Sequence, residues 1–288
     1  MGALENRNCI VTGASRGLGT KIANAFWAEG ANVMLVARST ESLARLVSSL
    51  PQRPKQRAIA LTADLSDPKA PECILSAAQN EFEALDVLVN NAGIQGPIGP
   101  AWDNSWDEWH VTLQVDMLSP VALCRLCVSW MARRGYGKVI NLSGGGATGP
   151  RANFSAYAVA KAGLVRFSET LAQETLALGI GVNCIAPGAM NTGILDAILK
   201  AGPQLAGQKE YEQALRIRQS GGAPLEQAAN LCVFLASAAS DGITGKLISA
   251  VWDPWETLAE HRDDLARTDI YTLRRIVPQD RGRAWGER

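Results

Sequence analysis

The chain has 288 residues, of which 47% are hydrophobic, and its 28 basic and 28 acidic residues give a formal net charge of zero. This length allows a large core in one domain or at most two. The balanced charge argues against a nucleic-acid partner and a membrane-attracted face, and no uninterrupted apolar stretch approaches the roughly 20 residues of a membrane helix.

Short β-rich apolar runs alternate with helical patterns along most of the chain. This alternation predicts an α/β fold, a Rossmann-like doubly wound parallel sheet of about seven strands with helices on both faces. The longest predicted helices lie around Trp106–Arg134 and Ser155–Leu178. The predicted strands are Asn8–Thr12, Asn32–Ala37, Ala58–Ala63, Val87–Asn90, Lys138–Leu142, Val182–Ala186 and Lys246–Val251.

Two segments depart from this rhythm. Residues 192–222 form a helical, glycine-punctuated insertion before the last helix and strand, and residues 253–288 follow the last strand. We therefore expect a single domain over residues 1–252 with an insertion, followed by a C-terminal extension. Both segments are candidates for substrate or partner contacts.

The first predicted strand runs directly into a glycine-rich stretch, Thr12–Gly19, that opens a helix. Glycines permit a tight turn and let backbone N–H groups approach a pyrophosphate at the helix N-terminus, where the helix dipole favours negative charge. The position of this stretch between a strand and a helix makes the signal specific. It predicts a dinucleotide cofactor.

The end of the second strand indicates which dinucleotide is preferred. Enzymes that prefer the unphosphorylated cofactor usually place an acid there, whereas this chain has Ala37 followed by Arg38. Arg16 projects from the glycine-rich loop, and two converging guanidinium groups would suit a 2′-phosphate. The expected cofactor is therefore NADP(H).

Tyr157 and Lys161 are four residues apart, so they share one face of a predicted helix. An unperturbed tyrosine has a pKa of about 10, and the charge of a nearby lysine would make it a better acid. Tyr157 is therefore the candidate proton donor.

The cysteines indicate neither a metal site nor disulfides. Cys124 and Cys127 form a CxxC pair without a second pair, and the chain has only two histidines. Buried thiols in a reducing compartment are the better interpretation, so we expect a cytoplasmic protein with no metal. The first residues, MGALENRNCIVTG, do not read as a secretion signal.

Taken together, these motifs resemble the short-chain dehydrogenase/reductase family, "classical" subtype, from about residue 6 to about residue 252. The resemblance implies an enzyme that interconverts a carbonyl and an alcohol, and it assigns residue roles by position. The implied catalytic residues are Tyr157, Lys161, Asp116 and Ser143. The implied cofactor residues are Gly13, Ser15, Arg16, Gly17, Leu18, Gly19, Arg38, Asp64, Leu65, Asn91, Ala92, Gly93, Tyr157, Lys161, Pro187, Gly188 and Thr192.

Two positions depart from the family pattern. The family serine that steadies the substrate oxygen aligns with Gly144, and Ser143 would reach the site only if the glycine run shifted its register. The family asparagine aligns with Asp116, whose added negative charge should face Lys161 or a water. Thr148 or Ser155 could supply the missing hydrogen-bond donor instead.

These departures leave three functions open. The first is an NADPH-preferring oxidoreductase on a small or medium organic substrate. The second is a non-redox acid/base enzyme such as an epimerase, dehydratase or lyase, and the third is a cofactor-binding protein with little turnover. Trp102, Trp106 and Trp109 could line a substrate ring site or pack in the core. The family resemblance also implies a homotetramer or homodimer.

Overall fold

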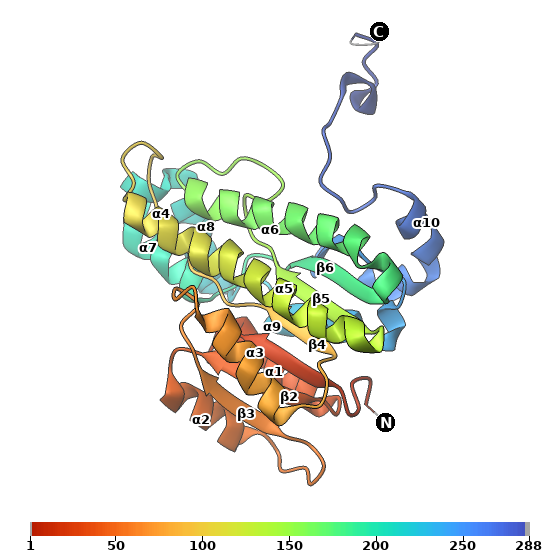
Figure 1. Cartoon of the computed structure of the whole chain (residues 1–288). Helices are drawn as coiled ribbons and strands as arrows, with labels where there is room; N and C mark the ends of the chain where they lie inside the picture. Colours follow the sequence, from red (N-terminus) through yellow and green to blue (C-terminus); the bar gives the residue numbers. More distant parts are fainter. Residues whose placement is uncertain (1, 286–288) are drawn as a thin grey trace.

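The computed structural model describes residues 2–285 and contains a seven-stranded parallel sheet with helices on both faces (Figure 1). The strand order is β3-β2-β1-β4-β5-β6-β7, so the direction of winding reverses between β1 and β4. In sheets of this kind, ligands bind at the carboxyl ends of the strands beside that reversal. The strands are β1 (Asn8–Thr12), β2 (Asn32–Ala37), β3 (Ala58–Thr62), β4 (Val87–Asn90), β5 (Gly137–Leu142), β6 (Ile180–Ala186) and β7 (Leu247–Ser249).

The predicted doubly wound sheet is confirmed, and every strand begins and ends within two residues of its predicted range. The α-helices are α1 (Gly17–Ala28), α2 (Thr40–Ser49), α3 (Ala70–Glu81), α4 (Trp106–Leu113), α5 (Ser119–Met131), α6 (Ser155–Glu174), α7 (Gly193–Ala206), α8 (Gln208–Ser220), α9 (Leu225–Ala236) and α10 (Arg262–Arg267). Short 3₁₀ turns lie at Ala132–Arg134, Leu176–Leu178, Ala238–Ser240, Trp255–His261 and Pro278–Arg281.

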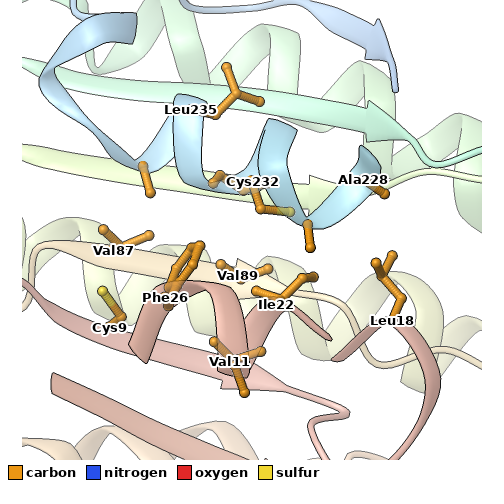
Figure 2. Packing of buried hydrophobic residues seen from close by; sticks show 14 of the residues in the cluster. Cys9, Val11, Leu18, Ile22, Phe26, Val87, Val89, Ala228, Cys232 and Leu235 are labelled. Atoms are coloured by element: carbon orange, nitrogen blue, oxygen red, sulfur yellow. The ribbon is translucent and has the colours of Figure 1, made fainter. Parts of the chain in front are cut away.

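One core layer packs α1 and α9 against the sheet. Leu18, Ile22 and Phe26 recur every fourth residue, so they form one apolar stripe on α1. Figure 2 shows this stripe facing Cys232 of α9 across a shared core, with strand residues such as Val89 beside it. Because α1 is held in this way, the glycine-rich loop that precedes it has a fixed position.

The other face of the sheet is covered by α3, α5 and α6. Helix α5 continues α4 through η1 (Gln114–Leu118), a π-helical turn. The whole segment, Trp106–Arg134, is long and apolar enough to cross a membrane by length and composition, although 44% of its most apolar window is buried inside the protein. The buried side chains of α5, among them Leu123, Cys127 and Trp130, belong to the core that packs against this face of the sheet.

The C-terminal extension crosses the outer edge of β7. The Leu247 N–H donates to the Tyr271 carbonyl oxygen at 2.8 Å, and the Leu273 N–H donates to Glu169 Oε1 of α6 at 2.6 Å. The described residues beyond this contact project away from the body of the protein (Figure 1). The last three residues of the predicted extension lie outside the described range.

Candidate active site

A cleft of about 1470 Å³ opens at the carboxyl ends of the strands. Every residue that the sequence predicted for the cofactor lines this one cleft, together with Ser143. Asp116 is the exception, because it is fully buried and does not line the cleft. The volume exceeds the roughly 300–1,000 Å³ of an ordinary small-molecule pocket, as a dinucleotide and a substrate together require.

The glycine-rich loop leaves a cradle that side chains would fill. Gly13 has a φ of +66°, and a Cβ added there would lie 2.8 Å from the Ala92 Cα atom. A Cβ at Gly19 would lie 2.1 Å from the Gly13 carbonyl oxygen. Helix α1 follows with no side-chain cap and no acid in its first turn. Its free N–H groups therefore fit a pyrophosphate.

The loop is tied to the end of β4 by hydrogen bonds. Thr12 Oγ1 accepts from the N–H groups of Asn91 and Ala92, both at 3.1 Å. Asn91 Nδ2 in turn donates to the Thr12 carbonyl oxygen at 2.9 Å. The Asn91–Gly93 segment is therefore held along the floor of the cleft.

The two predicted phosphate-binding arginines both line the cleft. Neither Arg16 nor Arg38 forms a side-chain hydrogen bond or ion pair with any other residue in the range 2–285. Arg38 directly follows β2, whereas the guanidinium of Arg16 lies near Gly193, where an added Cβ would be 3.2 Å from Arg16 Cζ. Both cations are therefore free to bind an anion.

Tyr157 and Lys161 lie on α6, and both are buried. Lys161 Nζ lies 5.6 Å from the centre of the Tyr157 ring and donates to the Leu142 carbonyl oxygen at 3.1 Å. Burial raises the pKa of Tyr157, and the positive charge of Lys161 acts in the opposite direction. The charge of Lys161 thus acts in the predicted direction, but burial has the larger effect, so the pKa of Tyr157 lies above its ordinary value.

Asp116 lies behind these two residues, in the π-helical turn η1. A proline four residues later, Pro120, has no N–H for the Asp116 carbonyl in the α-helical pattern, which favours the local irregularity. Asp116 Oδ1 accepts from the Ile94 N–H at 2.8 Å, and Oδ2 lies 3.6 Å from Lys161 Nζ. Burial raises the pKa of Asp116 even though Lys161 lowers it. The extra negative charge therefore faces Lys161.

Gly144, and not Ser143, lies against the Tyr157 hydroxyl. The Ser143 N–H donates to the Ile185 carbonyl oxygen at 2.8 Å, so the ladder between β5 and β6 continues without a register shift. Ser143 Oγ is buried and forms no hydrogen bond in the described structure. A Cβ at Gly144 would lie 2.2 Å from Tyr157 Oη, so this position has no room for a serine. The strand geometry therefore turns Gly144 towards the Tyr157 hydroxyl, and a donor role for Ser143 stays a prediction.

The structure changes the interpretation of two other sets of residues. Trp102 and Trp106 are 84% and 65% exposed, and none of the three predicted tryptophans lines the cleft, whereas Trp252 does. Of the alternative donors, Thr148 lines the cleft, but Ser155 does not, and its Oγ is buried with no hydrogen-bond partner among residues 2–285. Trp106 instead packs against the half-buried Trp109, with ring centres 5.8 Å apart.

Sequence reasoning missed the pair Arg151 and Glu210, which both line the cleft and join the segment before α6 to α8. No local sequence pattern indicates this pair, because the two residues are 59 positions apart.

A doubly wound parallel sheet with a glycine cradle at its winding reversal defines a dinucleotide-binding protein of the Rossmann type. The model of the short chain dehydrogenase family matches residues 7–201. The chain therefore belongs to the short-chain dehydrogenase/reductase family, whose members are oxidoreductases that use nicotinamide cofactors.

Characterised relatives support this assignment over most of the chain. The chain is 36% identical to 3beta-hydroxysteroid dehydrogenase 1 of Eggerthella lenta over 84% of this chain and 91% of that protein. It is 33% identical to the 3-oxoacyl-[acyl-carrier-protein] reductase FabG of Salmonella typhimurium, over 85% of this chain and 96% of that protein. Among solved structures, levodione reductase has a TM-score of 0.78 at 26% identity, and the match covers 89% of this chain and 99% of that one. YwfH, an NADPH-dependent reductase involved in bacilysin biosynthesis, has a TM-score of 0.76 at 25% identity, over 85% and 97%.

Proposed function

We propose that the protein is an NADP(H)-dependent oxidoreductase that interconverts a carbonyl and an alcohol on a small or medium organic substrate. The observation that carries this proposal is that Tyr157 and Lys161 share one cleft with the glycine cradle and with two unpaired arginines. When bound, the nicotinamide ring supplies the hydride or accepts it.

The side chains of this site would then handle the proton. Tyr157 Oη forms no hydrogen bond in the described structure and lies at the cleft, so it can give a proton to a substrate carbonyl oxygen or take one from an alcohol. Lys161 would hold the nicotinamide ribose and lower the pKa of the tyrosine. Residues 192–222, which form α7 and α8, would cover the substrate.

The preference for the phosphorylated cofactor rests on Arg38 and Arg16. A guanidinium after β2, with Ala37 in place of an acid, suits a 2′-phosphate. One structural relative, YwfH, is described as NADPH dependent.

Arg38→Asp tests this preference. The substitution removes a charge-assisted contact and adds a carboxylate that repels the 2′-phosphate and can bind ribose hydroxyls. We expect NADPH to bind about 10–100-fold more weakly, while NADH binds equally well or better. Titration calorimetry with both cofactors measures this change. Arg53→Asp, an exposed change outside the cleft, is the matched control. Equal affinities for NADPH and NADH in the unmodified protein would contradict the proposal.

Asp116→Asn tests how Asp116 affects the proton donor. The Asp116 carboxylate raises the pKa of Tyr157, so removing its charge should lower that pKa. In alcohol oxidation the tyrosinate accepts the proton of the substrate hydroxyl, so the rate rises with pH as Tyr157 ionises. A lower pKa of Tyr157 should therefore move this rise to lower pH. The pH dependence of kcat for an alcohol that the protein oxidises measures this shift. An unchanged limb would show that Asp116 does not influence Tyr157.

A non-redox acid/base enzyme on the same fold is the second candidate function, and a cofactor-binding protein with little turnover is the third. Gly144 favours both, because a missing oxyanion donor typically costs about 10²–10³ in rate. Analysis of cofactor and substrate masses after incubation separates the three, because only the first function changes the oxidation state of both.

We propose a homotetramer or homodimer in the cytoplasm, with no nucleic-acid or membrane partner. Exposed apolar side chains on the helical segment Trp106–Arg134 and on α6, among them Trp106, Leu118 and Val159, support association between copies of this protein. All six cysteines are free thiols, which fits a reducing compartment.

A further inference from the structure

A fixed guanidinium lies at the cleft, next to the glycine run, and has no part in the proton transfer described above. Arg151 Nε and Nη2 both donate to Glu210 Oε2 of α8, at 3.1 and 2.7 Å. Arg151 Cζ also lies 3.9 Å from the centre of the Phe154 ring, and Phe154 is fully buried. Because one edge of this guanidinium is hydrogen-bonded to Glu210 and one face is stacked on Phe154, its orientation is fixed.

The remaining nitrogen of this guanidinium is a spare donor. Arg151 Nη1 forms no hydrogen bond or ion pair in the part of the chain that the structure describes. A Cβ added at Gly145 would lie 3.4 Å from Nη1, which places this nitrogen over the glycine run. Arg151, Gly145 and Tyr157 all line the same cleft. An oriented nitrogen with two unused N–H bonds can bind an acceptor there.

This donor lies beside Gly145, next to the position in the site that lacks a hydroxyl. Gly144 lies against the Tyr157 hydroxyl where a serine would otherwise donate to the substrate oxygen, and Ser143 Oγ forms no hydrogen bond. Arg151 is also close enough for its positive charge to lower the pKa of Tyr157, as Lys161 does, against the rise caused by burial. The guanidinium therefore lies against Gly145, the residue next to the position that lacks a hydroxyl.

We propose that Arg151 is a catalytic residue whose Nη1 donates a hydrogen bond to the reacting substrate oxygen, in place of the hydroxyl missing at Gly144. This inference rests on the proposed function. In reduction the carbonyl carbon gains the hydride, and the carbonyl oxygen gains the proton of Tyr157. Arg151 transfers neither a proton nor an electron. Glu210 balances the guanidinium charge, so the donor suits the oxygen of a neutral carbonyl whose negative charge grows only during reaction.

Reduction of 4-nitrobenzaldehyde with NADPH tests the donor. Arg151→Met should lower kcat about 10²-fold with NADPH affinity unchanged, and Arg151→Lys should retain part of the rate. Added guanidinium chloride should restore turnover to Arg151→Met, whereas equal sodium chloride should not. Glu210→Gln keeps the guanidinium and should lose less than Arg151→Met. A loss in Glu210→Gln as large as in Arg151→Met, without rescue by guanidinium, would mean that the pair only holds α8 in place and would overturn the proposal.

A second measurement needs no turnover. The oxyanion 4-nitrophenolate, followed by its absorbance in the presence of NADP⁺, should bind about tenfold more weakly to Arg151→Met than to the unmodified protein. If the unmodified protein leaves the aldehyde unreduced, reductase activity fails for this probe, and the phenolate measurement alone decides the role of Arg151. Equal phenolate affinity in the two proteins, or no phenolate binding to either, overturns that role.

Discussion

Tyr157→Phe is expected to abolish turnover while folding and cofactor affinity stay unchanged. The substitution removes one oxygen from a buried ring, and that oxygen forms no hydrogen bond in the described structure. Little packing is therefore lost, whereas the proton donor is removed completely. General acid catalysis contributes about 10²–10⁴ to a rate, so the loss should be at least of that size. Steady-state kinetics, thermal unfolding and cofactor titration measure the three properties separately.

The matched control is Tyr136→Phe. Tyr136 Oη is also buried and has no hydrogen-bond partner within the described part of the chain, but Tyr136 does not line the cleft. Loss of the Tyr136 hydroxyl should leave kcat unchanged. Substantial turnover in Tyr157→Phe would mean that the proton comes from another group, and Asp116 would be the first suspect because burial raises its pKa.

Lys161→Met is expected to lower turnover, cofactor affinity and stability together. The lysine ammonium donates to the Leu142 carbonyl and faces the Asp116 carboxylate, and the proposed function also gives it the nicotinamide ribose. Without it, the fully buried Asp116 carboxylate keeps the Ile94 N–H as its one hydrogen-bond partner among the described residues. Breaking a buried pair by removing one partner costs about 3–5 kcal/mol of unfolding free energy.

The loss of stability in Lys161→Met should depend on pH. Burial raises the pKa of Asp116 in the folded state, and the loss of Lys161 removes a charge that lowers it. The destabilisation should therefore be small below the unfolded pKa of an aspartate and should grow as pH rises towards the folded value. Urea unfolding at acidic and neutral pH measures this difference. The double variant Lys161→Met/Asp116→Asn should regain stability at neutral pH but not cofactor affinity. Equal stability of Lys161→Met and the unmodified protein would contradict this account.

Local patterns were enough to predict the sheet and the cofactor side of the cleft. The glycine loop, the Asn91–Gly93 segment and the Tyr157–Lys161 pair each depend on neighbours in the sequence or on one helical turn. Their spacing therefore predicts their geometry. Strand alternation also indicated correctly that Gly144, rather than Ser143, would face Tyr157.

The parts that were not predicted depend on contacts between distant segments. The Arg151–Glu210 pair joins residues 59 positions apart, and a charge pattern alone does not indicate which opposite charges meet. The tryptophans after β4 have the composition of a binding site, but the chain path after Gly93 places Trp102 and Trp106 on the surface. Aromatic composition is similar in a core, a pocket and an interface, so only the fold distinguishes them.

The contact between the extension and β7 limits the access of other molecules to the edge of the sheet. The outermost strand of an open sheet presents unpaired backbone groups, which can recruit a strand from another molecule and start aggregation. Here the Leu247 N–H already donates to the Tyr271 carbonyl oxygen of the extension on that side of β7. In addition, Lys246 Nζ donates to the carbonyl oxygens of Thr268 and Ile270, at 3.0 and 2.9 Å. The extension thus covers backbone groups that would otherwise be open to strand addition at one end of the sheet, which is separate from any chemistry in the cleft.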